Sequence, residues 1–235
     1  DYVVNHSAST NPLFARAAAS KNNTYRDWYV WRDVAPTDWK LFGNNPWHTL
    51  PTGAYLGGFH HSMPDFNLLN TKVLNYHLDS MRFWLNRGVD GFRFDAVSHL
   101  VENGPNAMTD QPENFHILTQ IREAMSAYEN RYLVCEATGQ SERYGAPQIM
   151  GSAFAFGLNG DIVSAAKGDA TALKKVANYF VQNTNFNMAT FLANHDEFAG
   201  KRLADQFGDD EAGNKLALSI LITLPGVPFI YYGEE

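Results

Sequence analysis

The sequence has 235 residues, of which 45% are hydrophobic and 18% charged, enough to bury the core of one large domain. The formal net charge of −7 disfavours nucleic-acid binding, which uses basic surfaces. No apolar run reaches the ~18 residues of a membrane span, and the single cysteine, Cys135, excludes an internal disulfide. We therefore expect a globular protein without a nucleic-acid or membrane partner.

Both ends of the sequence resemble the interior of strands. The sequence opens on "DYVVNH" without an initiator Met and closes on "GVPFIYYGEE". We expect it to be an excerpt from a longer protein, so the lack of a signal peptide does not inform about the compartment.

Runs of apolar, β-branched and aromatic residues predict buried strands. Their hydrophobicity is continuous rather than alternating, which is typical of strands covered on both faces of a parallel sheet. The runs are 1–5, 91–96, 131–137, 152–158, 188–196 and 227–233.

Helical patterns lie between most of these runs, at 71–88, 112–130, 169–183 and 210–224. In the first pattern, Thr71 is the expected N-cap and Gly88 the expected end. Its apolar face is formed by Val73, Leu74, His77, Leu78, Met81 and Leu85. Strands that alternate with helices predict an α/β fold with a parallel sheet, and the number of repeats favours most of a (β/α)8 TIM barrel.

The stretch 7–70 interrupts this alternation. It is rich in Trp, Tyr, Asn, Pro and Gly and carries few helical signals. We interpret it as an irregular subdomain inserted into a barrel formed by 1–6 and 71–235, because long insertions of this kind often carry function. One or two of its aromatic rings are expected to stack on a ligand, and the others to form its core; the candidates are Trp28, Tyr29, Trp31, Trp39, Trp47 and Tyr55.

Polar residues cluster where the predicted strands end. Working residues of such barrels lie at the carboxyl ends of the strands. A single buried Asp there is more often structural, but carboxylates on four strands indicate a shared role. The residues are Asp1, Asn5 and His6; Arg93 and Asp95; Glu136; and Asn194, His195 and Asp196.

Two carboxylates in different environments are what glycoside cleavage requires. Asp95 shares a strand face with Arg93, whose charge would keep it ionised as a nucleophile. Glu136 follows the apolar run "YLVC", which would raise its pKa as an acid requires. Asp196 would bind sugar hydroxyls.

The ordered motifs resemble those of the α-amylase family, glycoside hydrolase family 13. "DYVVNH", "GFRFDAVSH", "CEA" and "FLANHD" resemble its four signatures, "MPDFN" (63–67) an additional motif and "GVPFIYYGEE" the end of its eighth strand. The resemblance spans the whole chain and implies barrel strands three to eight. It places the chain in the group intermediate between oligo-1,6-glucosidases and neopullulanases.

The resemblance implies a role for each matching residue. Asp95 is the nucleophile, Glu136 the general acid/base and Asp196 the transition-state stabiliser of a retaining mechanism. The implied substrate contacts are His6, Arg93, His195, Asp1 and His99.

Two positions after the implied nucleophile bear on bond preference. Ala96 is similar to members that act on α-1,4 bonds, since members that prefer α-1,6 bonds tend to have Val there. Ser98 replaces the lysine of the α-amylase motif "DAVKH", which weakens the case for endo-acting hydrolysis. We expect an α-1,4-glucan hydrolase acting on starch or maltooligosaccharides, with an oligosaccharide α-glucosidase or a transglycosylase as the alternative.

The resemblance also implies a structural Ca²⁺ site. Asn5 and the His99 carbonyl match two of its ligands, and oxygen ligands suit Ca²⁺. The candidate carboxylates are Asp27, Asp33 and Asp38, none of them convincing. The alternative is that Asn5 only caps a loop by hydrogen bonding. No organic cofactor is expected.

Two other classes of protein are alternatives to a glycoside hydrolase. A non-catalytic amylase-like scaffold would have lost catalytic groups, whereas this sequence keeps all three carboxylates, Arg93 and both histidines. An unrelated barrel enzyme would need a Schiff-base lysine or a phosphate-binding glycine loop placed before a helix, and "LPGVPFIYYG" is not such a loop.

Overall fold

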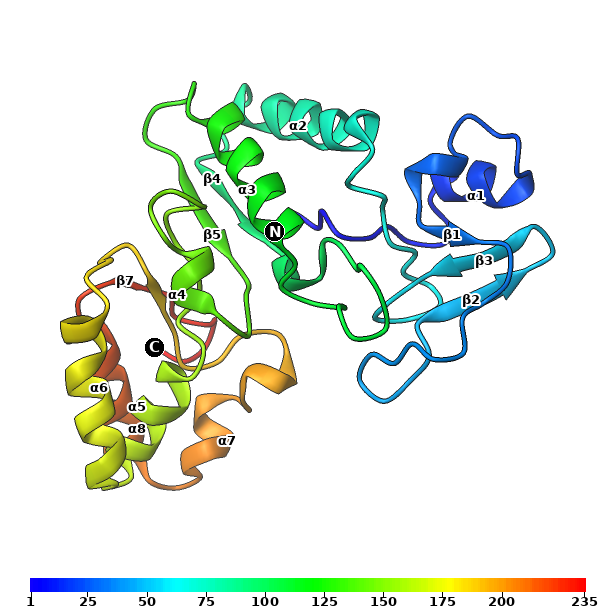
Figure 1. Ribbon diagram of the computed structural model, residues 1–235. Helices are drawn as coiled ribbons and strands as arrows, with labels where there is room; N and C mark the ends of the chain where they lie inside the picture. The colour runs from blue at the N-terminus through cyan, green and yellow to red at the C-terminus, as the bar shows by residue number, and fades with distance from the viewer. The chain divides into compact units, whose positions relative to one another are not determined.

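The structure is a computed structural model that describes residues 1–235 (Figure 1). The chain forms two compact units, Asp1–Leu133 and Val134–Glu235. The boundary between them falls inside strand β5 (Tyr132–Cys135). No helix is both long and apolar enough to span a membrane.

The first unit contains the start of a parallel sheet. Tyr2 pairs in parallel with Phe94 of β4 (Gly91–Phe94). The Tyr132 amide, at the start of β5, donates to the Asp90 carbonyl at 2.9 Å. Gly91 has a φ of 154°, and a Cβ on it would lie 1.8 Å from the Tyr132 carbonyl oxygen. Only glycine therefore fits at this close approach of two backbones.

The first unit also contains two long helices that contact each other, α2 (Thr71–Leu85) and α3 (Pro112–Met125). All six residues of the apolar face predicted for α2 are buried, which confirms the helical pattern. Its N-cap, however, is Asn70, whose side chain accepts from the Lys72 amide at 3.0 Å, so the prediction of Thr71 was wrong by one residue. Asparagine and threonine both cap helices, and the Asn70 backbone has the extended conformation that a cap needs.

The stretch 7–70 contains more regular structure than its sequence indicated, although its predicted boundaries remain a prediction. A helix and a 3₁₀ turn precede an antiparallel sheet of order β1-β3-β2. Pro12 opens the helix and the Asn11 side chain caps it. The elements are α1 (Pro12–Ala19), η1 (Arg26–Trp28), β1 (Trp31–Arg32), β2 (Trp47–Leu50) and β3 (Gly53–Leu56).

The second unit also contains parallel pairs. Cys135 pairs with Ala153, and Phe154 with Ala189. Strand β6 (Ala189–Thr190) then pairs with β7 (Val227–Pro228), also in parallel. Its helices are α4 (Ser141–Tyr144), α5 (Leu158–Ala166), α6 (Ala170–Gln182), α7 (Leu203–Phe207) and α8 (Glu211–Thr223), of which α5 packs on both α6 and α8.

In this unit one predicted strand needs correction and two predicted helices are confirmed. The strand expected at 152–158 ends early, because Gly157, with a φ of 91°, turns the chain and α5 begins at Leu158. The helices expected at 169–183 and 210–224 are present and are capped by Asp169 and Asp210.

Candidate active site

The end of β4 brings together charged groups of the first unit. The Arg93 guanidinium donates to an Asp95 carboxylate oxygen, and its Nε lies 3.9 Å from an Asp1 carboxylate oxygen. The Arg93 and Asp95 side chains are only 10% and 19% exposed, so their attraction is weakly screened by solvent. The Asp95 amide donates to the Tyr2 carbonyl at 3.2 Å, which fixes the backbone beneath the carboxylate. The ion pair predicted from the sequence is therefore formed.

The chain turns sharply after Asp95. Ala96 has the left-handed conformation, with φ 51° and ψ 37°, which non-glycine residues seldom adopt. The turn η2 (Val97–His99) follows, and the His99 amide donates to the Ala96 carbonyl at 3.0 Å. Backbone strain of this kind is common at functional sites.

Two of the predicted substrate-binding histidines also lie in the first unit. Burial lowers the pKa of His6, although the nearby Asp95 carboxylate raises it. His99 is 8% exposed, and burial lowers its pKa to about 4. The ring of Phe59 contacts both, with its centroid 5.5 Å from that of His6 and 5.0 Å from that of His99. Both histidines therefore favour the neutral form, in which one ring nitrogen donates a hydrogen bond and the other accepts one.

In the second unit, Glu136 directly follows β5 and is 6% exposed. Its neighbours Cys135 and Ala137 are fully buried, and burial raises the pKa of the Cys135 thiol. The Ser141 hydroxyl donates to the Ala137 carbonyl at 2.7 Å, which closes the turn after Glu136. The burial expected for Glu136 is present.

The other predicted residues of the second unit follow β6. The His195 Nε2 lies 3.2 Å from an Asp196 carboxylate oxygen, and the two side chains are 50% and 34% exposed. The Asn194 side chain accepts from the Asp196 amide at 2.8 Å. Asp196 then begins the turn η3 (Glu197–Ala199).

A buried carboxylate that the sequence did not single out contacts Asn5. The Asn5 amide donates to Asp65 Oδ1 at 3.1 Å, and the Gly58 amide donates to Asp65 Oδ2 at 2.8 Å. Asp65 is 1% exposed, and burial raises its pKa to about 7 despite these two hydrogen bonds. Burial, and then the Asp65 charge, raise the pKa of Glu102. The signal in the sequence was the motif "MPDFN", which contains Asp65.

The arrangement of Asn5, Asp65 and Glu102 provides part of a site for an oxygen-ligated cation. Two carboxylates that share a buried region repel one another, and a divalent cation would offset that repulsion. No group of three or more His, Cys, Asp or Glu side chains is gathered tightly enough to hold a metal by itself. Ca²⁺ there would also need the Asn5 side chain and backbone carbonyls, which are ligands it accepts.

The aromatic residues of the inserted stretch mostly form its core. Trp39 and Trp47 pack edge to face, with centroids 5.3 Å apart. Trp31 is contacted by two side chains, because Phe14 stacks on it at 5.7 Å and the Arg26 guanidinium lies 3.4 Å from a ring centroid. Of the six candidates for ring stacking on a ligand, those that are buried are Tyr29, Trp39, Trp47 and Tyr55.

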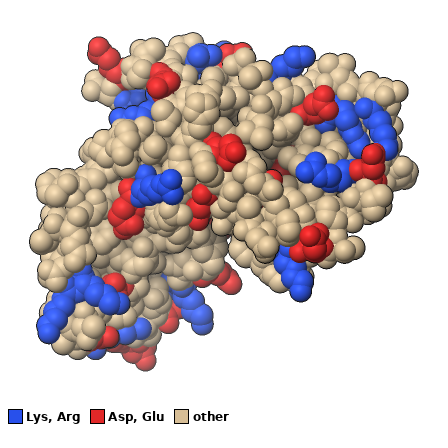
Figure 2. Space-filling model, viewed as in Figure 1, with Lys and Arg blue, Asp and Glu red and all other residues tan.

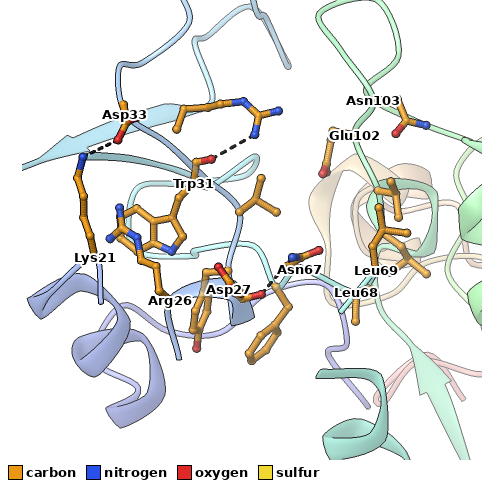
Figure 3. A pocket seen from close by; sticks show the side chains of 16 residues that line it. Lys21, Arg26, Asp27, Trp31, Asp33, Asn67, Leu68, Leu69, Glu102 and Asn103 are labelled. Carbon is orange, nitrogen blue, oxygen red and sulfur yellow. Dashed lines mark hydrogen bonds and ion pairs between the residues drawn. The ribbon is translucent and has the colours of Figure 1, made fainter. Parts of the chain in front are cut away.

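A cavity of about 610 Å³ lies beside β1 in the first unit, and Asp95 is not among the residues that line it (Figure 3). Lys21 and Asp33 point toward each other at one side and form an ion pair of 2.5 Å, while Glu102 and Asn103 lie at the opposite side. Basic and acidic groups are also mixed over the neighbouring surface (Figure 2). Asp33, one of the calcium candidates, is thus paired with a lysine.

Comparison with known proteins gives a consistent result. The family model described as "Alpha amylase, catalytic domain" matches residues 1–235. Alpha-amylase 3 of Dictyoglomus thermophilum is 35% identical and is matched over 100% of this chain and 46% of its own length. The probable oligo-1,6-glucosidase 3 of Bacillus subtilis is 28% identical, over 100% of this chain and 49% of its own.

The solved structures agree. The crystal structure of the α-amylase from H. orenii matches with a TM-score of 0.84 and 35% identity, over 99% of this chain and 48% of that chain. The chain spans about half the length of these relatives. The predicted fold class, part of a (β/α)8 barrel, is confirmed by these matches.

Proposed function

The chain belongs to the α-amylase family, and on that premise we propose that the full-length protein hydrolyses α-1,4-glucosidic bonds of starch or maltooligosaccharides with retention of configuration. The observation that carries the proposal is the partly buried Arg93–Asp95 ion pair at the end of β4. An ionised carboxylate held by a guanidinium fork is suited to attack a carbon that develops positive charge.

The proposed mechanism has two displacements. In the first, an Asp95 oxygen attacks the anomeric carbon while the Glu136 carboxylic acid gives its proton to the leaving glycosidic oxygen, which forms a covalent glycosyl-enzyme. In the second, the Glu136 carboxylate takes a proton from water, and that water displaces Asp95 from the sugar. Two inversions return the original anomer.

The remaining predicted residues act on the sugar itself in this proposal. Asp196 accepts hydrogen bonds from sugar hydroxyls, and these strengthen as the ring flattens in the oxocarbenium-like transition state. His6 and His195 donate to the same sugar, while Arg93 and Asp1 keep the nucleophile aligned. The Arg93 contacts with both carboxylates support this role.

We further propose a structural Ca²⁺ held by Asn5, Asp65 and the His99 carbonyl, with Glu102 adding negative charge. Bound Ca²⁺ would supply positive charge to buried carboxylates and tie "MPDFN" to the strand that carries Asn5. The raised pKa values of Asp65 and Glu102 support this. Added Ca²⁺ should raise the thermal midpoint of the EDTA-treated full-length protein. An Asp65→Asn variant should lose that shift and Asp38→Asn should keep it; a shift that survives Asp65→Asn contradicts the site.

An oligosaccharide α-glucosidase or a transglycosylase is the alternative. It is favoured by Ser98, where the α-amylase motif has lysine, and by the similarity to the B. subtilis oligo-1,6-glucosidase. Ala96 favours α-1,4 bonds. The two functions differ in whether isomaltose or starch is cleaved.

The test uses the full-length protein with starch, maltotriose, isomaltose and pullulan, and follows products and their anomeric form over time. α-Anomeric maltooligosaccharides from starch, lost in both Asp95→Asn and Glu136→Gln, would support the proposal. Cleavage of isomaltose with starch untouched would favour the oligo-1,6-glucosidase. Absence of activity on every α-glucan would favour a non-catalytic scaffold and remove the role assigned to Asp95.

A further inference from the structure

The segment after Asp196 is held in place by side chains from elsewhere in the second unit. The Asn159 amide, at the start of α5, donates to the Ala199 carbonyl at 2.7 Å. Gly200 follows with a φ of 126°, a conformation that favours glycine and directs the chain toward α7. The turn that begins at Asp196 is therefore fixed by contacts rather than by regular pairing.

Arg202 attaches this segment to the residues after β7. Its Nη2 donates to the Tyr232 carbonyl at 2.6 Å. The guanidinium also lies 4.5 Å from the ring centroid of Tyr231 and 4.4 Å from that of Tyr232. One side chain thus combines a charge-assisted hydrogen bond with cation–π contacts to two rings.

Glu234 provides the second attachment. Its Oε1 accepts from the Leu203 amide at 3.0 Å, at the first residue of α7. Glu234 is 9% exposed and Leu203 is fully buried, so this hydrogen bond is shielded from water. Burial raises the pKa of Glu234, while the Leu203 amide and the Arg202 charge lower it. The Glu234 carboxylate therefore interacts with both Leu203 and Arg202.

We propose that Arg202 and Glu234 are positioning residues that hold the segment 197–203 and thereby fix the direction in which Asp196 presents its carboxylate. This inference rests on the proposed function, in which Asp196 stabilises the transition state. The Asp196 side chain is 34% exposed, so packing encloses it only partly. In this inference, the placement of the backbone that follows Asp196 therefore contributes to the direction of its carboxylate. Small displacements of such a group are costly to the transition state.

The test uses the full-length protein and 4-nitrophenyl α-maltotrioside, with kcat and KM measured separately. Glu234→Ala removes the acceptor for the Leu203 amide and should lower kcat about 10- to 100-fold with little change in KM. Glu234→Gln keeps a carbonyl acceptor and should recover most of that loss. Glu235→Ala, at the neighbouring exposed carboxylate, is the matched control and should stay within about 2-fold of the unmutated protein.

A double-mutant cycle separates positioning from general damage to the fold. If Glu234 acts through Asp196, Glu234→Ala should lower kcat far less in an Asp196→Asn background than alone. The same cycle with Arg202→Lys and Arg202→Met tests the contact made by Arg202. These variants replace Glu234→Ala in the test if that variant does not fold. Equal losses in both backgrounds, or losses of kcat that follow the thermal midpoint, would overturn the inference.

The same data distinguish this inference from the proposed function. If Asp196→Asn alone leaves kcat unchanged, the role proposed for Asp196 fails. If Asp196→Asn lowers kcat by several orders of magnitude but every Arg202 and Glu234 variant matches the unmutated protein, only the positioning role fails.

Discussion

Asp95 and Asp196 both follow a parallel strand, yet the structure holds them in different ways. Asp95 is 19% exposed and paired with Arg93 from its own strand, so its support is local in sequence. Asp196 is 34% exposed, and the segment after it is held by Arg202 and Glu234. The support of Asp95 thus comes from its own strand, whereas the segment after Asp196 is attached to the residues that follow β7.

Removing the Asp95 charge should have the largest effect. Asp95→Asn eliminates the proposed nucleophile while keeping the side-chain shape, so kcat on maltotriose should fall on the order of 10⁴-fold or more. Asp90→Asn is the matched control, since Asp90 directly precedes β4 and its side chain is 90% exposed. A residual rate within 10-fold of the unmutated protein would contradict the assignment of Asp95.

Changing the partner of Asp95 should have the next largest effect. Arg93→Lys keeps a positive charge but loses the planar fork that reaches toward both Asp1 and Asp95. We expect kcat to fall about 10²- to 10³-fold, while Lys→Arg replacements elsewhere on the surface should have little effect. Steady-state kinetics measure this. An Arg93→Lys enzyme with unchanged kcat would mean that charge alone supports Asp95.

Acid should loosen the region around Asp95 before the segment after Asp196. His77 is 3% exposed, its Nδ1 lies 3.1 Å from the Tyr2 hydroxyl, and burial lowers its pKa from 6.5 to about 4. Between these two values the unfolded chain takes up a proton that the folded chain does not. The free energy of unfolding should therefore fall as pH drops from 6.5 to 4, by about 3 kcal/mol from this group.

Chemical denaturation at several pH values measures that change. His77→Asn keeps an acceptor for the Tyr2 hydroxyl and should reduce the dependence, while His99, whose pKa burial also lowers to about 4, keeps its own contribution. The exposed His116→Asn should leave the dependence unchanged. The Asp95 amide donates a hydrogen bond to the Tyr2 carbonyl. Hydrogen exchange should show that this amide loses protection as the pH falls. An equal slope in all three proteins would exclude His77 as the cause.

The smallest expected effect concerns Ala96. A β-branched side chain tolerates the left-handed conformation poorly, so Ala96→Val should lower the free energy of unfolding by about 1–2 kcal/mol. Ala96→Gly, which adopts this conformation freely, is the matched control and should change stability by less than about 1 kcal/mol. Thermal unfolding compares the two. A Val variant as stable as the Gly variant would show that the turn relaxes.

Much of the fold could be predicted because it follows from patterns of hydrophobic residues that are local in the sequence. The apolar face of α2 and the alternation of strands with helices follow directly from residue spacing. The Arg93–Asp95 pair was predictable for the same reason, since two residues of one strand separated by one position share a face.

Contacts between distant positions were not predictable in this way. Asn5 and Asp65 are 60 residues apart, and Leu203 and Glu234 are 31 apart, so no periodicity relates them. The two-residue strand β1 is too short to show alternation, which is why the stretch 7–70 read as irregular. The apolar run at 152–158 predicted a strand over its whole length. The positive φ of Gly157 turns the chain before the end of that run.

The single cysteine of this sequence can be used to measure the rate of local opening. Cys135 is fully buried next to Glu136, and burial raises the pKa of its thiol, so the reactive thiolate is scarce in the closed state. A thiol-specific reagent can modify it only when the end of β5 separates from its neighbours. The labelling rate of Cys135 therefore reports how often the strand beside the proposed acid/base opens, without an engineered cysteine.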